Sequence, residues 1–369
     1  MRFLRAIPVA LGLAAAFALA GPASAQVLFG QAGPNFKNLV DNSNFNIYQR
    51  GTTAVTTITT TATYHADRWA GYSGTSTNET LTNITSSLPT GTGTPVFTNA
   101  EQVQRASGQT GVKPVCLIQE IPTADVTPLA GQPVTLSVWA LASSNFSATS
   151  SILNAQVATG TGSDQGLASF ISGWTGAATP INYSATLTTN WQRFAVTGTL
   201  ASTATEAAVN ICFTPTGTAG TNDYFQITGV QLEQGTVATN LEWRPAGVEL
   251  TKVERYAYAV NEGTITAGTA MAPAGQAPTS TTCLVPFVFP VTMRTAPTYT
   301  NALSGTTFKL NSAAANTALT TPFSATTGAN TVANGSITFT ASGLGATAGF
   351  SCVLVSAAGS GQILFTADF

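Results

Sequence analysis

The sequence predicts an all-β protein: an antiparallel jelly-roll sandwich, a short helical linker, and a second, smaller β-sandwich domain. Three observations support this prediction. Short segments rich in Val, Ile, Thr and aromatic residues recur along the chain, and clusters of Gly, Pro, Asn and Asp separate them. Only 8% of the residues are charged while 44% are hydrophobic, which favours neutral strand surfaces over disorder.

Residues 1–25 have the layout of a secretory signal peptide. Two arginines precede an apolar run over residues 6–20, and small residues follow a Gly-Pro break. The run is shorter than the roughly 20 residues that a membrane-spanning helix needs, so we expect cleavage before Gln26 rather than a retained anchor. The mature protein is then exported and carries no transmembrane segment, and residues 26–37 form a lead-in.

Residues 38–245 form the predicted jelly roll. Apolar and polar residues alternate in 133–142 and 191–200, so that one side of each strand faces a core. The strand candidates are 55–64, 133–142, 191–200, 206–215 and 223–235. Turn signals between these candidates are typical of an antiparallel sandwich.

Residues 246–260 form the predicted helical linker. Apolar and charged residues recur there at helical spacing after Pro245, with Glu249 and Val253 four residues apart. This is the only helix that we expect in the mature chain.

Residues 261–369 form the predicted C-terminal β domain. The strand candidates are 281–292, 307–310, 336–342, 349–356 and 361–369. The domain carries four charged residues, which are Glu262, Arg294, Lys309 and Asp368. Such a neutral surface keeps a monomer in solution poorly, so we expect this domain to drive self-association.

The four cysteines divide evenly between the two predicted domains. Export permits disulfides, and pairing within each domain gives Cys116–Cys212 and Cys283–Cys352. All four also lie in apolar segments with a strand-like pattern, where free cysteines pack as small hydrophobic side chains. Both states remain open, but the wide spacing and the single histidine, His65, argue against a metal site.

Charge and motifs exclude several function classes. The formal net charge is −2, and Lys and Arg are scattered singly, so no basic surface for nucleic acid is indicated. His65 has no nucleophile motif beside it, and no pair of acids stands out for glycoside hydrolysis. We therefore predict a protein that is not an enzyme.

Five segments carry a resemblance to a known family. They are 38-NLVDNSNFNIYQRG-51, 64-YHADRWAGY-72, 129-LAGQPVTLSVWALA-142, 190-NWQRFAVTGTL-200 and 227-ITGVQLEQGTVATNLEWRP-245. In type and order they resemble bacteriophage tail-fibre and receptor-binding proteins built on a carbohydrate-binding-module-like jelly roll. The segment 287-FVFPVTMRTAPT-298 and the terminal ILFTADF are similar to the C-terminal piece of the same family.

The resemblance implies binding of a cell-surface polysaccharide and a homo-oligomer, most often a trimer. It also implies that a structural calcium ion is possible, with Asp41, Asn42 and Glu233 as oxygen donors; no other cofactor is expected. The signal peptide departs from the family, because tail proteins assemble inside the host cell. The expected location is therefore extracellular or at the cell surface, and a virion remains the alternative.

Three aromatic residues are the candidate ligand-binding residues. Trp174 lies between glycines, and Tyr183 and Tyr72 lie in polar segments rich in turn-forming residues. Exposed rings of this kind stack on sugar C–H faces, although each ring could instead cap one end of the sandwich. Trp139 and Trp191 lie in strand candidates and are expected in the core.

Asp67, Arg68 and Trp69 form a compact acid–base–aromatic group. We expect Asp67 and Arg68 to pair with Glu233 or Arg244, and Trp69 to lie in the core. In the alternative interpretation the two charged side chains contact sugar hydroxyls.

Two functional hypotheses follow. In the first, the jelly roll is an adhesion module that binds a glycan. In the second, the chain is a building block of an extracellular fibre, surface layer or virion appendage and has no glycan binding of its own.

Overall fold

The computed structural model of the protein describes residues 36–260, 270–300, 308–312, 324–327, 330–340, 344–356 and 362–369. The expected signal peptide and nearly all of the lead-in lie outside these residues. Within the described chain, no helix is both long enough and apolar enough to cross a bilayer.

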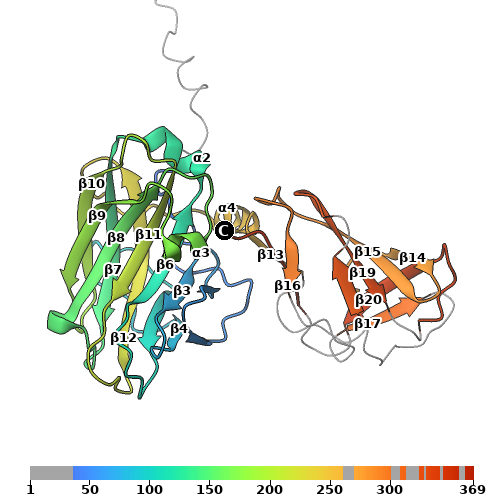
Figure 1. The fold of residues 1–369 in the computed structure, drawn as a ribbon, viewed down its shortest axis with the longest axis horizontal. Helices are drawn as coiled ribbons and strands as arrows, with labels where there is room; N and C mark the ends of the chain where they lie inside the picture. The colour runs from blue at the N-terminus through green and yellow to red at the C-terminus, as the bar shows by residue number, and fades with distance from the viewer. Residues whose placement is uncertain are drawn as a thin grey trace, which may run out of the picture. The chain divides into compact units, whose positions relative to one another are not determined.

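Residues 55–234 form a sandwich of two six-stranded antiparallel sheets, which is the jelly-roll-like all-β architecture that the sequence predicts (Figure 1). The first sheet has the order β1 (Val55–Ile58), β4 (Glu79–Ile84), β5 (Ala100–Arg105), β12 (Asp223–Gln234), β7 (Pro133–Ala142) and β10 (Gln192–Thr199). The second sheet has the order β2 (Thr63–Tyr64), β3 (Ala70–Ser73), β6 (Val115–Ile121), β11 (Glu206–Phe213), β8 (Ile152–Gly160) and β9 (Ala178–Thr186).

The main core lies between these sheets, and strand alternation decides which side chains enter it. On β8, Leu153, Ala155 and Val157 are buried in the core. Asn154 and Gln156, which alternate with them, are only partly buried on the outer face. The second sheet therefore presents polar side chains outward from an apolar inner layer.

Part of the outer face of the second sheet is covered by α3 (Leu167–Ser172) and the residues that follow it. Leu167 and Trp174 pack there on Ala70, Ile118 and Ala208. This cover buries the outer-face residues Ile118 of β6 and Ala208 of β11, two strands that are buried at every position.

Three helical segments contradict the expectation of a single helix. They are α2 (Thr123–Val126), α3 (Leu167–Ser172) and α4 (Ala246–Glu254). The first two are four and six residues long, too short to show helical periodicity in the sequence. Two short 3₁₀ turns, η1 (Thr127–Leu129) and η2 (Thr149–Ser151), add to the helical content of the described residues.

The linker is only partly helical. As expected, α4 begins directly after Pro245, but it ends at Glu254. Residues Ala257–Val260 form β13, which pairs with β21 (Ile363–Thr366). The prediction of a helix to residue 260 is wrong. After a turn at residues 255–256, the chain pairs as a strand with a segment that is distant in sequence.

The C-terminal part also contains two sheets. One has the order β13, β21, β16 (Thr298–Thr300). The other has the order β17 (Phe308–Ser312), β20 (Ser351–Ser356), β14 (Gly275–Thr279), β15 (Thr282–Val288), β19 (Asn334–Thr340) and β18 (Ser324–Thr327). A second apolar core joins them, in which the ring centroids of Phe287 and Phe365 are 5.0 Å apart.

Both disulfides of the expected pairing are present. Cys116–Cys212 joins β6 to β11, and Cys283–Cys352 lies in the C-terminal core. No cysteine is left free, so the alternative of four buried thiols is excluded in this structure.

Residues 65–69 form a tight turn between β2 and β3. Trp69 is fully buried in the main core, as predicted. The carboxylate of Asp67 pairs with Arg50, with 2.9 Å between Nη1 and Oδ1. The Nε atom of Arg68 lies 3.5 Å from Oδ2 of Asp41.

The expected partners of this turn are therefore wrong. Glu233 lies 3.8 Å from the ammonium group of Lys37, and Arg244 pairs with Glu249 at 3.1 Å. The prediction assumed that Asp67 and Arg68 lie in a strand, which would place their side chains along a sheet edge. They lie in a turn instead, and their side chains therefore meet other partners.

The prediction that Trp139 and Trp191 lie in the core is also wrong. Both are only partly buried. Trp139 alternates with the core residues Val138 and Ala140 on β7 and therefore lies on the outer face, beside Phe97. Trp191 precedes β10 and donates a hydrogen bond from Nε1 to the carbonyl oxygen of Ser87 at 2.7 Å.

Candidate functional site

A cleft of about 620 Å³ lies over the outer face of the second sheet. Its lining comes from β3, β6, β11 and β8, from α3, and from the loops between β1 and β2, after β3, before β6 and after β11. The lining residues are Thr60, Tyr72, Ser73, Gly74, Thr75, Lys113, Pro114, Cys116, Asn154, Gln156, Ile171, Asn210, Cys212 and Thr214. Most of these are uncharged side chains that carry a hydroxyl or an amide group.

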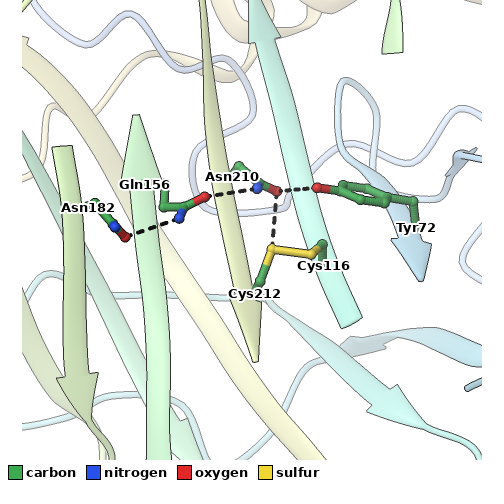
Figure 2. The surroundings of a disulfide bond; sticks show 6 residues. All are labelled: Tyr72, Cys116, Gln156, Asn182, Asn210 and Cys212. Carbon is green, nitrogen blue, oxygen red and sulfur yellow. Dashed lines mark hydrogen bonds between the residues drawn. A yellow bond between two sulfur atoms is a disulfide. The ribbon is translucent and has the colours of Figure 1, made fainter. Parts of the chain in front are cut away.

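A row of hydrogen-bonded polar side chains crosses the sheet at this cleft (Figure 2). The phenol of Tyr72 donates to Asn210 Oδ1 at 3.2 Å, and Asn210 Nδ2 donates to Gln156 Oε1 at 3.3 Å. Gln156 Nε2 donates in turn to Asn182 Oδ1 at 3.0 Å. We call these four residues the amide row; Tyr72, Asn210 and Gln156 line the cleft, and Asn182 extends the row onto β9.

Strand register produces the amide row. Asn210 on β11 lies directly opposite Gln156 on β8, and Gln156 lies directly opposite Asn182 on β9. Tyr72 lies on β3, and its side chain reaches across β6 to Asn210. Cross-strand neighbours on one face are close enough for short amide side chains to bond.

The amide row keeps unused hydrogen-bonding capacity. A primary amide has two N–H donors and an oxygen with two lone pairs. Within the row, Gln156 uses one donor and one lone pair, so one of each remains for a ligand. Burial raises the pKa of Tyr72 to about 12, against the opposing hydrogen bond to Asn210, so its phenol stays protonated at neutral pH.

The Cys116–Cys212 disulfide forms part of the cleft floor. The two cysteines are directly opposed on β6 and β11, and both line the cleft. Cys212 Sγ lies 3.4 Å from Asn210 Oδ1, so the disulfide contacts the amide row (Figure 2).

The structure places the three predicted aromatic residues in different surroundings. Tyr72 lines the cleft. Trp174 is only 6% exposed; its Nε1 donates to the carbonyl oxygen of Gln165, and its ring packs on Phe170. The expectation of an exposed loop ring at Trp174 is wrong, because α3 buries the ring against the sheet.

Tyr183 is directed into the sandwich. It lies on β9 between the buried residues Ile181 and Ala185, and its partly buried ring packs on the main core. Of the three candidates, only Tyr72 belongs to the cleft.

The proposed calcium donors are engaged in other contacts. Asp41 lies 3.0 Å from the ammonium of Lys252 and 3.5 Å from the guanidinium of Arg244. Glu233 accepts hydrogen bonds from Thr239 and Gln231. The third donor, Asn42, uses its side-chain amide on backbone groups nearby. Across the described parts of the chain, no group of three or more Asp, Glu, His or Cys side chains is arranged to hold a metal ion.

Sequence reasoning missed most of the cleft. Asn154 and Gln156 could have been identified as outward-facing from the alternation on β8. Asn182 and Asn210 could not be joined to them, because that step needs the register between strands that are distant in sequence. Lys113 lies outside any strand and gave no signal.

Comparison by sequence identifies no relative. No known family profile matches the chain, and no curated protein matches it.

Comparison by structure finds β-sandwich proteins of low identity. The enzymatically active domain of tailspike protein 4 from bacteriophage CBA120 matches 54% of this chain at 15% identity with a TM-score of 0.34, and the match spans 21% of that protein. The CBM22-1 xylan-binding domain of Paenibacillus barcinonensis Xyn10C matches 55% of this chain and 96% of its own, at 11% identity and a TM-score of 0.31. The module TmCBM61, solved with β-1,4-galactotriose, matches 54% of this chain and 100% of its own, at 10% identity and a TM-score of 0.30. The likeness is one of architecture alone.

Proposed function

We propose that the protein is an exported, non-enzymatic adhesion protein that binds a cell-surface polysaccharide in the cleft of the second sheet. The observation that carries this proposal is the amide row beside the open cleft. Its groups are neutral, fixed by their mutual hydrogen bonds, and still able to donate and accept.

The chemistry of the cleft suits a carbohydrate. Sugar hydroxyls donate and accept hydrogen bonds at closely spaced positions, and a side-chain amide can accept from one hydroxyl and donate to another. Because the amides already hold one another, little side-chain entropy is lost when a ligand binds. The aliphatic side chain of Ile171, which is 38% exposed at the cleft, offers an apolar contact for sugar C–H groups.

Binding without turnover is supported by the same lining. None of the cleft residues is Asp, Glu or His, the side chains that most often supply general acid and base catalysis. Export is supported by the two disulfides, since such bonds persist in oxidising compartments.

The double variant Gln156→Ala/Asn182→Ala tests the proposal. Both side chains are at least partly exposed, so the fold should persist, and we expect the Kd for a bound polysaccharide to rise about tenfold because two hydrogen-bonding groups are lost. Binding is measured on an array of cell-surface polysaccharides, and circular dichroism checks folding.

The matched control is Gln102→Ala on β5 of the first sheet. Gln102 also belongs to a row of side-chain amides, with Gln226 and Gln104, but lies outside the cleft. Equal loss of binding in the control and in the double variant would contradict the assignment of the site.

We propose self-association as a second function, and the observation that favours it is the outer face of β15. Leu284 and Val288 point outward there and are 37% and 68% exposed, while Cys283, Val285 and Phe287 face the core. A strand that is apolar on both faces is suited to contact with a second copy of the chain.

The double variant Leu284→Ser/Val288→Ser should shift the native mass from the expected trimer towards the monomer. Each side chain contributes about 1–2 kcal/mol when an interface buries it. Light scattering measures the mass. The control Val237→Ser changes a valine that is similarly exposed, at 72%, in the jelly-roll part. A monomeric wild-type protein would refute self-association.

A further inference from the structure

Lys113 is the one charged side chain that lines the cleft. It is exposed, and within the described chain it takes part in no ion pair. Seven other basic side chains do have acidic partners; these are Lys37, Arg50, Arg68, Arg105, Arg244, Lys252 and Arg294. The cleft therefore carries a positive charge that the protein leaves uncompensated.

The chain holds the stem of Lys113 in place. A Cβ atom on Gly74 would lie 2.1 Å from the Cβ atom of Lys113, so only glycine lets the lysine stem lie against the loop after β3. Gly111, two residues earlier, is tied down by hydrogen bonds to Ser76 and from the buried Arg105. The ammonium group is thus presented from a fixed backbone at the cleft.

The cleft continues beyond Ile171. A neighbouring hollow of about 320 Å³ shares Thr60 and Ile171 with it, and no Asp, Glu, His, Lys or Arg side chain lines it. An extended chain can therefore follow the outer face of the sheet, with an anionic group at Lys113 and uncharged sugar units along the remainder.

From these observations we infer that the ligand is an acidic polysaccharide, whose anionic substituent pairs with Lys113 while its sugar hydroxyls bond to the amide row. This inference rests on the proposed glycan binding and names the class of glycan. A uronate carboxylate and a sulfate ester share the required chemistry.

Two pairs of polymers with matched backbones test this inference on the full chain. They are polygalacturonate with its fully methyl-esterified form, and dextran sulfate with dextran. At low ionic strength we expect the wild-type protein to bind an acidic member about fivefold more tightly than its neutral counterpart, which is the upper range for one exposed ion pair. The difference should shrink as salt is added. Stronger preference within the dextran pair indicates a sulfate ester, and within the galacturonate pair a carboxylate.

Variants assign this preference to one residue. Lys113→Met should abolish the preference for the acidic member, and Lys113→Arg should retain most of it. Lys309→Met, which removes a positive charge from β17 instead, should leave it unchanged.

Three results would overturn the inference. If acidic and neutral members bind equally to the wild-type protein, or if Lys113→Met keeps the preference, the acidic class is wrong. In either case glycan binding itself still stands where Gln156→Ala/Asn182→Ala weakens it. If no polymer binds at all, the inference and the proposed function fail together.

Discussion

Arg105→Met is expected to lower the free energy of unfolding by about 3–5 kcal/mol, because it leaves Asp223 as a buried, unpaired charge. Both side chains are fully buried, and Arg105 Nε lies 2.8 Å from Asp223 Oδ2. The two residues are directly opposed where β5 ends and β12 begins, on the two central strands of the first sheet. Urea denaturation at constant pH measures the change.

The guanidinium of Arg105 also holds four other groups. Its two terminal nitrogens donate to the carbonyl oxygens of Gly111, Gly217 and Thr216 and to the hydroxyl of Ser147. Since Gly111 precedes Lys113, the variant should loosen the segment that presents the lysine as well as lower stability. Loss of the preference for acidic glycans should accompany the loss of stability.

Two comparisons separate this effect from a simple loss of charge. Lys37→Met breaks the ion pair with Glu233, in which Lys37 is 42% exposed, and should cost less than 1 kcal/mol. The double variant Arg105→Met/Asp223→Leu should be more stable than Arg105→Met, because no unpaired charge remains. A cost below 1 kcal/mol for Arg105→Met would show that the buried pair is not needed for the fold.

Glu120→Gln is expected to stabilise the protein at pH 8 much more than at pH 5. Glu120 lies on β6 and is 2% exposed, and neither of its carboxyl oxygens has a hydrogen-bond partner within the described residues. Burial raises the pKa of Glu120 to about 8, and the guanidinium of Arg68 opposes this rise only in part.

The sign of the pH effect follows from proton release. In the unfolded chain a glutamate has a pKa near 4.3, so between about pH 4.3 and 8 the folded state holds a proton that the unfolded state has lost. Stability therefore falls as pH rises through this window. Glutamine stays neutral, so the gain from the substitution should be on the order of 3 kcal/mol larger at pH 8 than at pH 5.

Calorimetry at the two pH values measures this gain. Asp125→Asn is the matched control for a change of net charge alone, because it removes the negative charge of an exposed acid on α2. A gain from Glu120→Gln that is equal at both pH values would mean that Glu120 is ionised in the folded protein throughout this range.

The parts of the fold that sequence predicts are those that depend on local patterns. Alternation along β7 and β8 identifies strands and their inner residues, and Pro245 marks the start of α4. The predicted division into two domains indicates which cysteines would pair, Cys116 with Cys212 and Cys283 with Cys352, but it leaves open whether they pair at all. These features need no knowledge of which strands are neighbours.

The parts that sequence does not predict depend on contacts between distant segments. Trp174 is buried because α3, a helix of six residues, covers the sheet. The glycine-flanked sequence around Trp174 does not indicate this burial. The amide row needs the register of β11, β8 and β9, and Tyr72 joins it only by reaching across a whole strand. Lys113 is held by a glycine that lies 39 positions earlier in the chain, since Gly74 and Lys113 meet only in the folded protein.

The floor of the cleft is complete only after the Cys116–Cys212 disulfide has formed. The bond joins residues 96 positions apart, and the chain between them includes β7, β8, β9 and β10. A newly made chain in a reducing compartment has all the side chains of the amide row but lacks the covalent link between two strands of its floor. The complete floor of the cleft is therefore a product of oxidation. Under the proposed function, an exported chain would bind its glycan with this complete floor only after it has left the reducing interior of the cell.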